Sequence, residues 1–189
     1  MHFRSFIFFI LPLLFLVPSG MAQKRVNATV NPNADALNHN ADIYDPATGL
    51  VTAAPGKMKA AREQNTAVRL LDGKVLIAGG YNNRHLKTAE LFDPDTGTFS
   101  DPKDDKMTSA RSGASAVLLD GGSVLIVGGY NGKYLSSGEL YDATTENFGF
   151  PGSAMQSERQ FFTATKLQNG RVFIAGGYNG SSFLSSAEL

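Results

Sequence analysis

One phrase returns three times along this chain, and the repeat limits the possible folds more than any other feature. The pairs Gly79-Gly80, Gly128-Gly129 and Gly176-Gly177 lie 48 or 49 residues apart, and each is followed by Tyr-Asn. The one-residue differences in spacing fall in predicted loops, where a structural repeat tolerates insertions. A single structural unit must therefore account for every copy.

Each copy predicts four short strands separated by turns. The first strand is "NTAVRLL" or "ASAVLL", and a glycine-bearing hairpin turn follows it. The second, "VLIAGG" or "VLIVGG", is apolar at every position, so both of its faces must be buried. The third is "TAELFD" or "SGELYD", and the fourth lies around Phe99 and Phe148. Four antiparallel strands in about 49 residues are typical of one blade of a β-propeller.

The glycine pair after an apolar strand, the Glu-Leu-Phe/Tyr-Asp third strand and the aromatic fourth strand resemble the kelch repeat. The resemblance covers residues 41–189 and implies an all-β fold, a β-propeller of kelch-type four-stranded blades. The units are about 41–58, 59–107, 108–155 and 156–189. Kelch repeats often carry tryptophan in the fourth strand, whereas this chain has none and places Val51, Phe99 and Phe148 there.

The repeats make about three blades, an incomplete ring, because propellers close with roughly four to eight. The first unit supplies only third and fourth strands, and the last stops before its fourth strand. Three explanations stay open. The sequence is a fragment with further blades beyond Leu189, or it is a homodimer completing a six-bladed propeller, or it is an open array.

Charged residues also recur at fixed positions in the repeat. They are Arg62, Arg111 and Arg159 before the first strand, and Glu90, Glu139 and Glu188 on the third strand, with Asp42 matching the glutamates upstream. A carboxylate among buried neighbours is costly unless it is paired. We expect each glutamate to meet a repeat arginine or backbone amides between blades. The alternative is that the arginines line an axial channel and bind an anionic ligand.

The N-terminus has the layout of a signal peptide. His2 and Arg4 precede an apolar run of about 15 residues, and Gly20 and Ala22 supply small residues before a cut near Ala22. A retained membrane anchor is the alternative, but the run is shorter than the roughly 20 residues that a bilayer needs. We expect a signal peptide at 1–22, an N-terminal linker at 23–40 and a secreted or extracytoplasmic protein.

The segments after the glycine pairs differ between copies, so they are the candidate binding loops. The candidates are Tyr81, Asn82, Arg84, His85, Tyr130, Asn131, Lys133, Tyr134, Tyr178, Asn179 and Phe183. Within this alignment, His85 corresponds to Tyr134 and Ser182. Tyrosine, asparagine and glycine form adaptable recognition surfaces for a protein or a glycan, although polar hairpin tips have a similar composition. The balance of 17 basic and 17 acidic residues gives no reason to expect nucleic acid, or a membrane after signal cleavage.

Motifs that carry chemistry are weak in this sequence. "DPDTG" at 93–97 resembles the start of a calcium loop, but "DPATG" and "DATTE" in the other copies keep only its first aspartate. An aspartate that caps its own turn explains all three copies. Kelch-like copper radical oxidases need a tyrosine cross-linked to cysteine, and this chain contains no cysteine. We expect no catalytic, cofactor or metal site, and a non-catalytic binding module. The alternatives are the propeller of a larger secreted enzyme whose catalytic residues lie elsewhere, and a structural surface-protein repeat.

Overall fold

The computed structural model describes residues 25–27 and 39–189, and the regular structure in this part of the chain consists of β-strands alone. The predicted signal peptide lies outside the described residues. No helix in the described ranges is long and apolar enough to cross a membrane.

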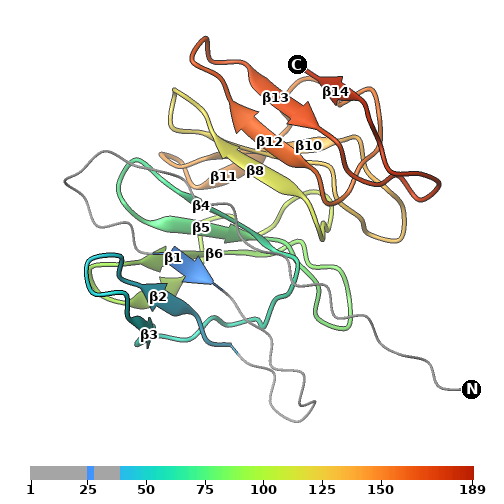
Figure 1. Ribbon diagram of the computed structural model, residues 1–189. Coiled ribbons are helices and arrows are strands. Elements are labelled where there is room, and N and C mark those ends of the chain that lie inside the picture. The colour runs from blue at the N-terminus through green and yellow to red at the C-terminus, as the bar shows by residue number, and fades with distance from the viewer. Residues whose placement is uncertain (1–24, 28–38) are drawn as a thin grey trace, which may run out of the picture.

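The strands form four antiparallel sheets that follow one another along the chain (Figure 1). The first sheet holds β1 (Arg25–Asn27), β2 (Asp42–Tyr44) and β3 (Val51–Ala53). The second holds β4 (Thr66–Arg69), β5 (Val75–Ala78), β6 (Ala89–Asp93) and β7 (Thr98–Ser100). The third holds β8 (Ser115–Leu118), β9 (Val124–Val127), β10 (Gly138–Asp142) and β11 (Asn147–Gly149). The fourth holds β12 (Thr163–Lys166), β13 (Val172–Ala175) and β14 (Ala187–Glu188).

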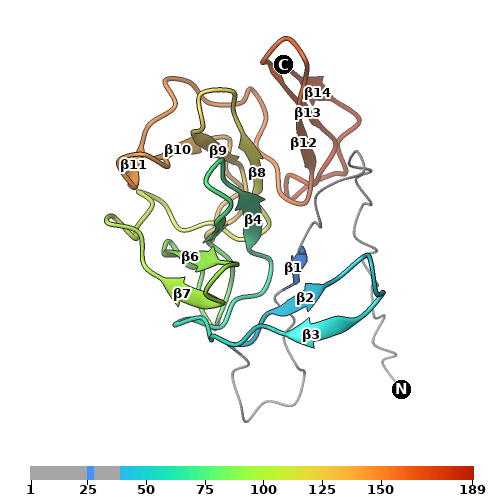
Figure 2. The same ribbon diagram turned by 90° about the vertical axis from the view of Figure 1, so that its left-hand side faces the viewer.

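The sheets are arranged around a common centre and leave the ring open, as Figure 2 shows. The first strands of successive repeats, β4, β8 and β12, lie against one another and form the inner edge of the array. The sheets β1–β3 and β12–β14 stand at its two ends. The all-β fold of four-stranded blades in an incomplete ring is therefore confirmed.

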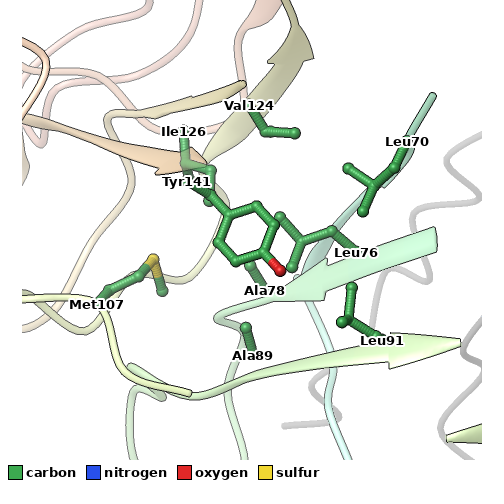
Figure 3. Close-up of a cluster of buried hydrophobic side chains, with 9 residues drawn as sticks. All are labelled: Leu70, Leu76, Ala78, Ala89, Leu91, Met107, Val124, Ile126 and Tyr141. Atoms are coloured by element: carbon green, nitrogen blue, oxygen red, sulfur yellow. The ribbon is translucent and has the colours of Figure 1, made fainter. Parts of the chain in front are cut away.

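The core lies between neighbouring sheets, and the third-strand aromatic residue occupies its centre. Tyr141 of β10 is fully buried and packs against Leu76 and Leu91 of the preceding sheet (Figure 3). Phe92 of β6 has the same role one junction earlier, where it packs with Met58 of the segment that follows the first sheet. The second and third sheets are thus each fixed to the preceding sheet by one aromatic side chain, which removes a large apolar area from water.

The fourth-strand aromatic residues support these central rings. Phe99 lies 4.8 Å from Phe92, and Phe148 lies 5.0 Å from Tyr141, measured between ring centroids. The second strand β5 is buried over three of its four residues, in agreement with its apolar sequence. Phenylalanine therefore fills the place where kelch repeats often carry tryptophan.

The N-terminal segment contains one strand that the sequence did not predict. Residues 23–40 were predicted to be a linker, but Arg25–Asn27 forms β1 and pairs antiparallel with β2, in the register Val26↔Ile43. The first repeat provides β2 and β3 without a second strand of its own, so without β1 the inner edge of β2 would have unpaired backbone groups. Such an edge attracts any extended segment within reach.

The aspartate turns are confirmed in all three copies. Asp93 Oδ1 accepts hydrogen bonds from the backbone N–H groups of Asp95 and Thr96, and Asp142 and Asp45 accept equivalent bonds. The bonds from the backbone N–H groups lower the pKa of Asp93 and Asp142 against the opposing effect of burial. These carboxylates are occupied as turn caps. No group of three or more potential metal-binding side chains converges in the described part of the chain.

Candidate functional site

The recurrent arginine and glutamate form an ion pair in three repeats, and both partners are buried in the second and third sheets, whereas Glu188 of the fourth is partly exposed. The distances between guanidinium nitrogen and carboxylate oxygen are 2.9 Å for Arg62–Glu90, 3.2 Å for Arg111–Glu139 and 2.6 Å for Arg159–Glu188. The glutamates also accept backbone N–H groups from the segment before the arginine, such as Lys59 for Glu90. The expected partners, an arginine and backbone amides, are therefore confirmed.

The position of the ion pair within the blades differs from the prediction. Arginine and glutamate belong to the same repeat, and the arginine backbone, rather than its side chain, reaches the preceding sheet. Gly80 N–H donates to Arg111 O at 2.7 Å, and Gly129 N–H donates to Arg159 O at 2.9 Å. A Cβ atom on Gly79 would lie 2.4 Å from Arg111 O, which explains why glycine occupies this position. The glycine pair and the arginine backbone together join each blade to the next.

The arginines do not line a channel. Their exposed fractions are 2% or less, and each guanidinium also donates to backbone carbonyl groups, as Arg62 does to Gly79 O and Thr88 O. Burial lowers the pKa of Arg111, and the hydrogen bond to Glu139 opposes this shift. The alternative of arginines that bind an anionic ligand is therefore wrong.

The predicted loops contribute six rings that form one continuous row. We call this set the aromatic row: Tyr81, His85, Tyr130, Tyr134, Tyr178 and Phe183. Each loop folds back so that its first and last rings face each other, through the bridges Tyr81↔His85, Tyr130↔Tyr134 and Tyr178↔Phe183. Centroid separations along the row are 5.1, 5.2, 4.9, 5.7 and 5.2 Å. The row therefore crosses from the second sheet to the fourth without a break.

The predicted alignment of the third loop with the first two is wrong by one residue. His85 and Tyr134 stand four residues after the loop tyrosine, so Ser182 was predicted to be their equivalent. The structure places Phe183 there, because one inserted residue lengthens the turn that Asn179 caps through the N–H groups of Ser181 and Ser182. A serine could not have continued the row.

The rings differ in exposure. The first five are half-buried, whereas Phe183 at the end of the row is 88% exposed. Desolvation, together with the neighbouring Tyr178 and Tyr130, raises the pKa of Tyr134. The His85 Nδ1 atom lies 3.1 Å from Ser112 Oγ. The sequence predicted these residues individually but did not predict that their rings form a row. The aromatic ring four residues after the loop tyrosine in two copies was a usable signal for such a row.

The polar candidates lie at the outer tips of the same loops. Arg84, Asn131 and Lys133 are exposed, and Asn82 and Asn179 are half-buried beside the loop tyrosines. Asn131 Oδ1 accepts the backbone N–H of Lys133 at 3.4 Å, so this asparagine also supports the turn. The structure therefore brings all the predicted loop residues to one side of the blades, with cationic side chains outside a row of rings.

Successive four-stranded antiparallel sheets around a common centre, joined by aromatic residues and glycine pairs, define an open β-propeller. The kelch motif matches the chain at residues 64–104 and 110–147, which include the second and third sheets. The chain therefore contains kelch repeats. No curated protein matches it at a significant level. Kelch repeats build β-propeller modules for protein interaction, and this is the class of function that the fold indicates.

Proposed function

We propose that this protein is a secreted, non-catalytic module that binds a protein partner through its loop face. The observation that carries the proposal is the aromatic row, with the exposed Arg84 and Lys133 beside it. Half-buried tyrosines supply rigid contact area at low entropic cost, and flexible cations at the rim supply steering and specificity. An acidic surface on the partner would complement these loops.

A protein partner fits this face better than a glycan. A sugar ring stacks on the open face of an aromatic side chain, but the inner rings of the row each contact two neighbouring rings. Tyr130, for example, lies between His85 and Tyr134. Phe183 alone among the six rings is largely exposed. Ring edges and polar loop tips are contacts that a protein surface can meet.

The proposal that the module is non-catalytic rests on the recurrent polar groups, which already have ion-pair or hydrogen-bond partners within the protein. The buried glutamates are bound to arginines and amides, and the turn aspartates accept backbone N–H groups. Groups held in this way are not poised to donate or accept a proton from a substrate. Secretion rests on the sequence of residues 1–22, and N-terminal sequencing of the exported protein tests the cut near Ala22.

The binding face is tested by comparing two charge-matched variants. The loop variant carries Arg84→Ser and Lys133→Ser, and the control carries Lys57→Ser and Lys103→Ser, which are exposed cations outside the loops. Each immobilised protein captures partners from culture medium of the source cells, and bound proteins are identified by mass spectrometry. A partner kept by the control and lost by the loop variant is the expected result. Equal capture by both variants contradicts the proposed face, and selective binding on a glycan array would favour a sugar ligand.

A further inference from the structure

The chain contains three Asn-Gly dipeptides, at 131–132, 169–170 and 179–180. In such a dipeptide the backbone nitrogen of the glycine can attack the side-chain carbonyl carbon of the asparagine, because the glycine has no Cβ atom to hinder the approach. Asparagine is a thermolabile residue. The attack needs a glycine nitrogen without a hydrogen bond and a side-chain amide that is free to turn towards it. These two conditions distinguish the three dipeptides.

The dipeptide Asn131-Gly132 meets both conditions. It lies at the exposed tip of the loop between β9 and β10. Gly132 has a φ of 106°, and a Cβ atom built on it would meet no atom within 4 Å. Within the described residues, the Gly132 N–H donates no hydrogen bond, and the Asn131 side chain forms only the long bond from the Lys133 N–H to its Oδ1 atom, at 3.4 Å. The attacking nitrogen and the amide are therefore both available.

The hairpin turn between β12 and β13 protects Asn169 from the same reaction. The Gly170 N–H donates to Leu167 O at 3.0 Å, so the nitrogen that would attack is bound within the turn. The Asn169 Oδ1 atom also accepts the N–H of Arg171 at 3.1 Å. Asn169 is exposed, as Asn131 is, so exposure alone does not distinguish the two sites.

The loop of the fourth sheet restrains Asn179, although this residue has the same place in its repeat as Asn131. The Asn179 Oδ1 atom accepts two backbone N–H groups, at 3.0 and 2.9 Å. The Gly180 carbonyl accepts the hydroxyl of Tyr178 at 2.9 Å. The ring of Tyr134 covers the glycine, because a Cβ atom on Gly180 would lie 2.5 Å from Tyr134 Cε2. The peptide group therefore cannot rotate without displacing a ring of the aromatic row.

We propose that Asn131 is a site of spontaneous deamidation and that the reaction opens the aromatic row. The Gly132 nitrogen forms a bond to Asn131 Cγ and loses its proton, and the side-chain nitrogen takes up a proton and leaves as ammonia. Water then hydrolyses either carbonyl of the five-membered succinimide. The products are aspartate and isoaspartate, in which the chain continues through Cγ. Water is the only co-reactant, and nothing is oxidised or reduced.

Isoaspartate adds one atom to the backbone between Tyr130 and Tyr134, whose ring centroids lie 4.9 Å apart across this loop. The pairing of these rings depends on the length of the loop. In the next repeat, one inserted residue moves the facing position from Ser182 to Phe183. An added backbone atom should therefore displace Tyr134 from Tyr130 and interrupt the row at its centre.

Both products also add a carboxylate, which is charged at neutral pH, to the tip that carries Lys133. The net positive charge beside the aromatic row falls by one, so an acidic partner should bind less tightly. This last consequence rests on the proposed function, whereas the reaction and the opening of the row do not.

Peptide mass spectrometry after incubation in mildly alkaline buffer measures amide loss at the three sites. Opening one ordinary hydrogen bond before attack slows the reaction about fivefold, so Asn131 in the folded protein should react at least about fivefold faster than Asn169 or Asn179. The protein unfolded in urea is the matched control, and its three dipeptides should react at similar rates. Equal rates in the folded protein, or a faster reaction at either of the other sites, overturn the proposal.

NMR spectra of the aromatic rings test the opening of the row. After incubation, the unaltered protein should show a second set of Tyr130 and Tyr134 ring signals near the positions of exposed tyrosines, and Tyr81 should keep its signals. The matched control is Asn131→Gln, whose longer side chain would have to form a six-membered ring, and it should show no second set. An isoaspartate fraction with unchanged ring signals overturns the opening of the row, as does a second set in the control.

The effect on binding is measured with the capture experiment described above. Asn131→Asp should retain less of the partner than Asn131→Gln, and equal retention overturns this consequence. If the unaltered protein captures no partner, the proposed function fails, while the mass spectra and the ring signals still decide whether Asn131 reacts and whether the row opens.

Discussion

The buried hydroxyl group of Tyr141 lowers the stability of the folded protein. The ring fills the junction between the second and third sheets, but its oxygen is buried without a hydrogen-bond partner in the described structure. Desolvation, followed by nearby carboxylates, raises the pKa of this group far above its ordinary value, so the hydroxyl stays neutral. A buried, unsatisfied hydroxyl costs about 1–3 kcal/mol.

Tyr141→Phe should therefore raise the free energy of unfolding by about 1 kcal/mol. Phenylalanine already stands at the equivalent position, Phe92, so the ring itself fits this kind of site. Urea denaturation followed by circular dichroism measures the change. The reverse substitution, Phe92→Tyr, is the matched control and should lower stability. A destabilised Tyr141→Phe would show that an ordered water or a shifted side chain satisfies the hydroxyl.

Removing one partner of a buried ion pair, in contrast, should lower the stability of the protein. Glu139→Ala removes the carboxylate from Arg111 and leaves a guanidinium that is 1% exposed without its counter-charge. Such a change should cost about 3–5 kcal/mol in the free energy of unfolding. Asp120→Ala, which breaks the exposed pair with Lys166, should hardly shift the urea midpoint. Similar losses in both variants would contradict the structural role of the buried pair.

At the scale of one element, the β10–β11 turn depends on the ionised side chain of Asp142. Bonds from the N–H groups of Thr145 and Thr144 lower the pKa of this carboxyl below its ordinary value of 3.8. The contribution of the cap to stability is therefore complete above pH 3.8 and is lost as the pH falls through the lower folded-state pKa. Asp142→Ala should remove this contribution at neutral pH.

A carbon-detected NMR titration of the carboxyl groups tests this prediction. The Asp142 and Asp93 carboxyl signals should titrate below 3.8. Stability of the unaltered protein and of Asp142→Ala should converge in acid. A difference that persists after Asp142 is protonated would assign the effect to packing rather than to the charge of the cap.

Strands and turns could be predicted from the sequence because each depends on local chemistry that recurs in every copy. The apolar run before the glycine pair predicted β5 and β9, and the repeated aspartates predicted the turns. The errors concern contacts that no single copy specifies. β1 depends on the open edge of β2, the next strand of the chain, which lies outside the repeated pattern of the other copies. Phe183 replaces Ser182 because an insertion shifts the loop register. The arginine and the glutamate were predicted to be partners. That both belong to one repeat, and that the arginine backbone contacts the preceding sheet, was not predicted.

At the scale of the whole molecule, the repeat makes every junction a copy of the others, so an incomplete junction can be recognised by comparison. The second and third sheets meet through Tyr141, through Gly80 N–H to Arg111 O and through His85–Tyr130. All three kinds of contact lack a partner at both ends of the array within the described residues. Stacked repeats gain much of their stability from such neighbours, so the end sheets should be the least stable part of an isolated chain.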